Sequence, residues 1–87
     1  MLWKAIPPPG IKGKIVRWYF HANHETISQE QLPPIRVDSS EPIVVDDDGM
    51  GLDGLILSVD LDNGNRYLLA FNRENHATPQ TEPLFEV

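Results

Sequence analysis

Three consecutive aspartates, Asp46, Asp47 and Asp48, are followed by spaced glycines in the segment IVVDDDGMGLDG. An EF-hand calcium loop needs oxygen ligands at its first, third and fifth positions and a glutamate at its twelfth. Counted from Asp46, the fifth position is Met50 and the twelfth is Leu57, so the ligand pattern fails. Because adjacent like charges need solvent, we expect an exposed turn between two strands, with a weak divalent-ion site as the alternative.

Histidines form the second candidate site. His21 and His24 lie three residues apart beside Glu25, and two imidazoles with a carboxylate are the ligand types that zinc or nickel binds. A zinc site normally needs three or four protein ligands, so a third ligand would have to come from a distant residue such as His76. We therefore expect exposed loop histidines and no bound cofactor, and a metal-binding protein or metal-dependent enzyme that uses these histidine and aspartate loops is the alternative.

Nucleophilic catalysis has no evident residues in this chain. A catalytic serine needs a histidine, an orienting carboxylate and a strand-turn-helix elbow, and no such elbow surrounds the serines Ser28, Ser39, Ser40 and Ser58. No glycine-rich phosphate loop is followed by a lysine or a helix. We expect a protein that is not an enzyme.

The aromatic run Trp18-Tyr19-Phe20 ends a segment of alternating character that begins at Ile11. Three consecutive aromatics on a strand must point to both faces of the sheet. The sheet therefore either curls into a barrel that buries both faces, or exposes Trp18 and Phe20 as a surface for a protein partner or a second copy of the chain.

The elements that must position these residues are short strands. Residues 11–20 predict a strand with Ile15 on the face opposite Trp18 and Phe20, and HANHETISQEQL predicts a connector with a helical turn of about a turn and a half, because Thr26 and Gln29 have capping-box spacing. PPIRVD and EPIVVD predict two brief strands or one bent strand at a sheet edge.

The clearest local prediction is a hairpin over LDGLILSVDLDNGNRYLLAFN. A three-residue loop, Asp62-Asn63-Gly64, pairs Val59 with Tyr67 and sets Asp60 opposite Arg66. A two-residue loop would place Leu61 opposite Arg66 instead. Matched apolar and charged pairs favour the three-residue loop.

The whole chain, residues 1–87, is expected to form one small, mainly β domain of four to five short antiparallel strands with one helical turn. That strand count and size suit an SH3-like barrel. Residues 1–10 are expected to form a proline-rich arm, and residues 77–87, which are polar and contain prolines, an irregular tail.

Composition narrows the function. Thirteen acidic and seven basic residues give a formal charge of −6, which argues against direct nucleic-acid binding because that binding depends on lysines and arginines that neutralise phosphates. The chain has no cysteine, which leaves the redox compartment open. No apolar run is long enough to span a membrane, and we expect a soluble, cytoplasmic protein. The predicted function is a non-catalytic accessory domain, in the manner of a small acidic inhibitor, in which Trp18, Phe20 and Asp46 to Asp48 engage a protein partner with a basic surface. A homodimer is a further possibility.

Overall fold

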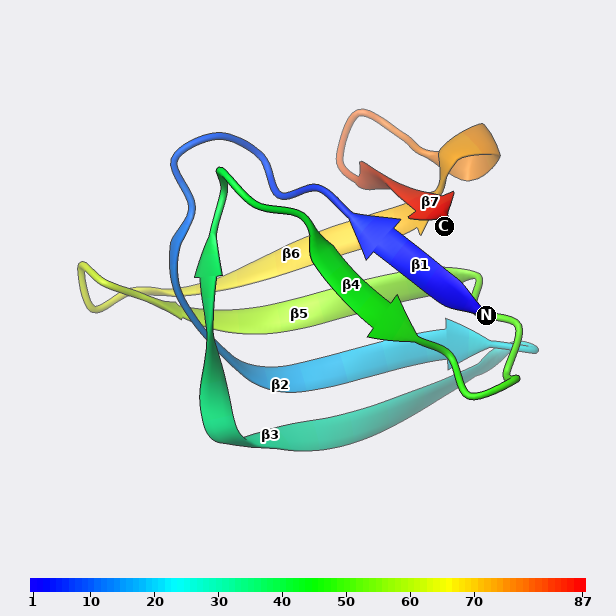
Figure 1. Ribbon diagram of the computed structural model, residues 1–87, viewed down its shortest axis with the longest axis horizontal. Coiled ribbons are helices and arrows are strands. Elements are labelled where there is room, and N and C mark those ends of the chain that lie inside the picture. Colours follow the sequence, from blue (N-terminus) through cyan, green and yellow to red (C-terminus); the bar gives the residue numbers. More distant parts are fainter.

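The computed structural model describes residues 1–87 and shows one seven-stranded sheet that curls into a nearly closed barrel (Figure 1). The strands are β1 (Leu2–Ala5), β2 (Lys12–Ala22), β3 (Glu25–Asp38), β4 (Ile43–Asp46), β5 (Gly54–Leu61), β6 (Arg66–Arg73) and β7 (Glu82–Glu86), and η1 (Glu74–His76) is a 3-10 turn between β6 and β7. Their order across the sheet is β3-β2-β5-β6-β7-β1-β4, so β3 and β4 are the two edges.

The prediction of a small, mainly β, barrel-like domain is confirmed. The predicted count of four to five strands is wrong, and the comparison with an SH3-like barrel, which rested on strand count and size, loses the support of the count. Not every pair is antiparallel either, since β6 and β7 run parallel. No helix in the structure reaches the length and apolar character that a membrane crossing requires.

The two strands that were not predicted lie at the chain ends. β1 pairs with both β4 and β7, and it buries Trp3 and Ala5 in the core, so the proline-rich arm is irregular only after Ala5. β7 likewise buries Leu84, so the tail at residues 77–87 is a strand over most of its second half. Strands of four or five residues show little periodicity in sequence, and here they are stabilised by pairing with each other at distant positions in the chain.

The segment after β2 is a hairpin and not a helical connector. Asn23 and His24 both adopt left-handed conformations, with φ of 53° and 64°, which is the backbone of a two-residue turn between antiparallel strands. The predicted capping box at Thr26 therefore lies inside β3, and the one helical turn is η1, near the other end of the chain. Tertiary pairing with β2 overrides the local helical signal.

An irregularity in β2 determines which side chains are buried. Ile15 pairs with Val59 of β5, but Arg17 pairs with Ser58, so Val16 is an extra residue that forms a β-bulge. The bulge shifts the alternation by one residue, and Trp18 therefore points to the same interior as Ile15. The predicted alternation, which placed Trp18 and Phe20 opposite Ile15, is wrong beyond Val16 for this reason.

The β5–β6 hairpin has the predicted register. Val59 pairs with Tyr67 and Asp60 with Arg66, and the loop closes through a hydrogen bond from the Leu61 N–H to the Asn65 carbonyl of 2.8 Å. Gly64 takes the left-handed conformation, with φ of 91°, that this loop requires.

The barrel interior is a single apolar cluster to which every strand except β4 contributes a fully buried residue. Its members are Trp3, Ala5, Ile15, Trp18, Phe20, Val37, Leu52, Leu55, Leu57, Val59, Leu69, Phe71 and Leu84. The rings of Trp18 and Phe20 stack within it, with centroids 5.9 Å apart. Burial of aromatic and branched side chains on this scale is the main stabilising contribution that so short a chain has.

Candidate functional site

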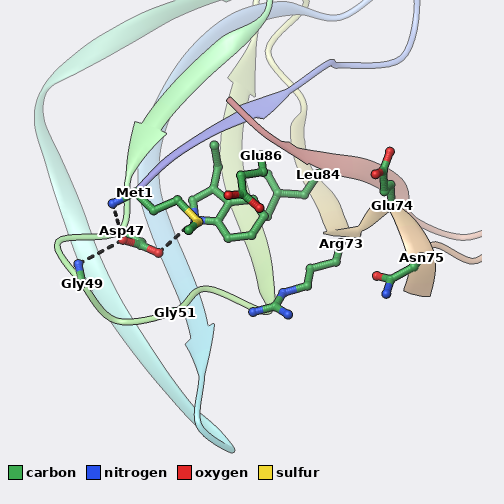
Figure 2. A pocket seen from close by; sticks show the side chains of 10 residues that line it. Met1, Asp47, Gly49, Gly51, Arg73, Glu74, Asn75, Leu84 and Glu86 are labelled. Atoms are coloured by element: carbon green, nitrogen blue, oxygen red, sulfur yellow. Dashed lines mark hydrogen bonds and ion pairs between the residues drawn. The ribbon is translucent and has the colours of Figure 1, made fainter.

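A cavity of about 550 Å³ opens at one end of the barrel, where the loop after β4 approaches the region of η1. We call this end the acidic mouth; its carboxylates belong to Asp46, Asp47, Asp48, Asp53, Glu74 and Glu86. Figure 2 shows Asp47 on one side of the cavity and Glu74 and Asn75 on the other, with Glu86 and Arg73 between them in this view. The remaining lining residues are Met1, Trp3, Gly49, Gly51 and Leu84.

Asp47 organises the wall of the cavity. Its side chain is 1% exposed, and its carboxylate accepts hydrogen bonds from four N–H groups. Oδ1 accepts from the amino group of Met1 at 3.2 Å and from the Gly49 N–H at 2.9 Å, as Figure 2 shows, while Oδ2 accepts from the Trp3 indole at 3.0 Å and the Leu52 N–H at 3.3 Å. A buried carboxylate is stable only when its oxygens are satisfied in this way.

These donors hold Asp47 in its charged form. The Trp3 indole makes the largest contribution to keeping the pKa of Asp47 well below its usual range, and the Gly49 N–H, the Met1 amino group and the Leu52 N–H add to it. Burial acts in the opposite direction but is outweighed. Asp47 in turn raises the pKa of the Met1 amino group. The result is a fixed negative charge beneath the mouth.

The three aspartates are therefore not equivalent, and the prediction that all of them form a solvated turn is wrong for Asp47. Asp46 and Asp48 are exposed as predicted. A usable signal was the alternation along β4, because Ile43 and Val45 pack against the core and the same period of two places Asp47 on the buried side. The full donor set could not be predicted, since the Trp3 indole and the Met1 amino group reach Asp47 only through the tertiary fold.

Arg73, which also lines the cavity, contacts residues of three different segments. Its Nε donates to the Leu52 carbonyl at 3.2 Å, its Nη2 lies 3.4 Å from Asp53 Oδ1, and its guanidinium stands 5.6 Å from the centre of the Trp3 ring. A guanidinium over an aromatic face is attracted by the π electrons. Arg73 thus joins the end of β6 to the loop before β5 and to β1.

The cations of the mouth are already paired. The Met1 amino group contacts Asp46 and Asp47, and Arg73 contacts Asp53. Asp48, Glu74 and Glu86 form no ion pair; Glu74 and Glu86 line the cavity, and Asp48 lies in the exposed turn after β4. At the other end of the barrel, four basic residues balance four acidic ones: Lys12, Lys14, Arg36 and Arg66 against Asp38, Glu41, Asp60 and Asp62. Much of the negative charge of the chain is thus concentrated at the mouth.

Trp18 and Phe20 are not at the surface. Each is 7% exposed, and the Trp18 indole donates to Gln31 Oε1 at 2.8 Å. Of the two alternatives for these rings, the structure has the barrel that buries them, and the exposed aromatic surface is absent at this place. The bulge at Val16, which turns them inward, has no clear signature in the sequence.

The histidines are not gathered into one site. His21 lies on β2, where its Nδ1 is 3.3 Å from Thr26 Oγ1, His24 is in the β2–β3 turn, and His76 ends η1. No group of three or more histidine, aspartate or glutamate side chains is arranged to hold a metal ion. The carboxylate with the most donors, Asp47, is filled by N–H groups that repel a cation.

Comparisons with models of protein families, with curated proteins and with solved structures found no match for this chain.

Proposed function

We propose that this protein is a non-catalytic accessory domain that binds the basic surface of a partner protein through its acidic mouth. The observation that carries the proposal is the cavity of about 550 Å³, which Glu74 and Glu86 line without ion pairs. Unpaired carboxylates grouped on one end of a protein create a negative potential that attracts lysine and arginine side chains and accelerates their approach.

The geometry also supports a binding role over a catalytic one. An acid–base pair needs two groups held in contrasting environments, one of them free to exchange a proton. The only buried carboxylate of the mouth is Asp47, and its oxygens are occupied by four N–H donors. Glu74 and Glu86 are exposed and suited to a cationic surface. The expected location in the cytoplasm goes with this proposal, and fractionation of cells that produce the protein tests it.

The cavity can receive one or two cationic side chains from a partner. Arg73 and the Met1 amino group do not oppose this, because their charges are neutralised by Asp53, Asp46 and Asp47. Binding of this kind weakens as salt is added, since exposed charges are screened beyond about 8 Å at physiological ionic strength.

The test uses two variants with equal loss of charge. Glu74→Gln with Glu86→Gln neutralises the mouth, and Glu41→Gln with Glu82→Gln neutralises two unpaired carboxylates that do not line the cavity. A lysine-rich peptide is titrated into each protein, and backbone chemical shifts are followed by NMR. We expect shifts in residues 46–53, 74–76 and 86, and weaker binding in the mouth variant alone. If both variants bind the peptide equally weakly, the interaction depends only on the net charge of the protein, and this result would contradict a defined binding site.

A further inference from the structure

The β3 edge, residues Glu25–Glu30, is the longest run of unpaired strand backbone in the barrel. On one side these six residues pair regularly with β2, from Ala22↔Glu25 to Arg17↔Glu30, and on the other side no strand is present. Every second residue of an edge strand directs its N–H and C=O away from its neighbour, so three of the six present free backbone groups. The other edge, β4, has only four residues and follows Pro42.

This edge lacks the usual protection against pairing. Natural edge strands carry lysines, prolines or bulges, and between Glu25 and Glu30 the chain reads TISQ, without any of them. Prolines occur only beyond it, at Pro33 and Pro34, where the pairing with β2 is interrupted before it resumes at Ile35. Thr26 and Ile27 are β-branched residues that favour an extended backbone.

Ile27 points toward the barrel interior, because it pairs with the buried Phe20, but it is 47% exposed. A side chain on the inner face is exposed to this extent because no strand continues the sheet beyond β3. Ile35 and Leu32 on the same strand are also exposed. The edge therefore offers unpaired backbone together with apolar side chains that a further strand would cover.

We propose that β3 pairs with β3 of a second copy of this chain, antiparallel and about a two-fold axis at Ile27. In this register Ile27 faces Ile27, Thr26 faces Ser28, and Glu25 faces Gln29 of the other copy. Moving the axis by one residue to Ser28 would set Ile27 opposite Gln29 and Thr26 opposite Glu30, so the apolar pair of isoleucines would be lost. The sequence thus complements itself in the first register, as a two-fold interface requires.

The charge distribution is compatible with this dimer. β3 begins beside the acidic mouth and runs away from it, so in the antiparallel pair the two mouths point in opposite directions (Figure 1). The net charge of −6 on each copy still opposes association. Added salt therefore strengthens the dimer, whereas it weakens binding of a basic partner at the mouth, and the two proposals succeed or fail separately.

Sedimentation velocity on the full chain tests the dimer. Six paired residues bury less than the ~1,200 Å² of a stable interface, so we expect a dissociation constant on the order of 100 μM. Ile27→Lys and Ile27→Glu should each be monomeric over the same range of protein concentration. At the two-fold axis the new charge of one copy would face the identical charge of the other copy, and the two would repel. An equimolar mixture of the two variants should restore a heterodimer of opposite charges. The control Val44→Lys, on the exposed part of the β4 edge, should dimerise like the unchanged protein.

Isotope-filtered NMR on a half-labelled sample gives a second readout that needs no substitution. Contacts between the copies from Thr26 to Ser28 are expected. A protein that stays monomeric up to about 1 mM overturns the proposal. Dimerisation of Ile27→Lys alone, or failure of the two variants to associate when both are folded by circular dichroism, places the interface elsewhere and overturns it equally.

Discussion

Asp47→Asn is the substitution that tests the structure most directly. The asparagine has the shape of the aspartate, but one carboxylate oxygen becomes an NH₂ group that can only donate. Two of the four N–H donors around Asp47 then face another donor, and the best arrangement keeps the oxygen toward Trp3 and Leu52, on the fully buried side. The Gly49 N–H and the Met1 amino group lose their acceptor.

The expected loss of stability follows from those two contacts. A hydrogen bond to a charged group contributes about 1.5–3 kcal/mol, and the Gly49 N–H and the Met1 amino group can each recover part of this from water because both residues are exposed. We expect the free energy of unfolding to fall by roughly 2–4 kcal/mol, a large share of the ~5–15 kcal/mol typical of a domain. Urea unfolding followed by tryptophan fluorescence measures it. Asp48→Asn, the same chemical change at an exposed neighbour, is the matched control and should have little effect.

The pH dependence provides an independent check. The folded state holds the pKa of Asp47 below its unfolded value of ~3.9, so its contribution to stability is fully present above about pH 5 and is lost as the pH falls through ~4 toward the lower folded value. Asparagine does not titrate. The stability difference between the two proteins should therefore be largest near neutral pH and shrink in acid. A variant within ~0.5 kcal/mol of the unchanged protein at neutral pH would refute the assignment of Asp47 as a buried, fully bonded charge.

Three further outcomes are expected. Trp18→Ala should lower the free energy of unfolding by ~3–5 kcal/mol in urea titrations, because it leaves a cavity in the core beside Phe20. A variant as stable as the unchanged protein would mean that the indole is not part of the core. Gly13→Ala should lower the melting temperature well below that of the neighbouring control Lys12→Ala, because the new Cβ would clash with the Asp60 carbonyl oxygen. Equal melting temperatures would contradict the close approach of β2 to β5. Millimolar calcium should leave the melting temperature unchanged, because the buried oxygens of Asp47 already accept hydrogen bonds from N–H donors. A ligand of the native state present at a hundred times its dissociation constant would add ~2.7 kcal/mol to the free energy of unfolding. A rise of several degrees in the melting temperature would therefore contradict this arrangement.

Local patterns in the sequence were sufficient for the β5–β6 hairpin. Its register depends on neighbours a few residues apart: Asp62-Asn63-Gly64 sets the turn, and the match of Asp60 with Arg66 distinguishes one pairing from its alternative. The mainly β class follows in the same way, from short alternating runs separated by proline and glycine. These features form through contacts between residues that are close in the chain, so their signals are present in a single sequence.

The tertiary structure alone decided where the ends of the chain and the key side chains lie. β1 and β7 are strands because each finds a partner far away in sequence, and Val16 bulges because β5 offers one residue fewer than β2 over the same stretch. That single extra residue turned Trp18 from an expected surface anchor into the core. The alternation along β4 indicates that Asp47 is on the buried side, but its distant donors, the Trp3 indole and the Met1 amino group, reach the carboxylate only in the folded chain. Each of these outcomes is a contact between residues that the sequence keeps apart, and no local pattern encodes which distant groups will meet.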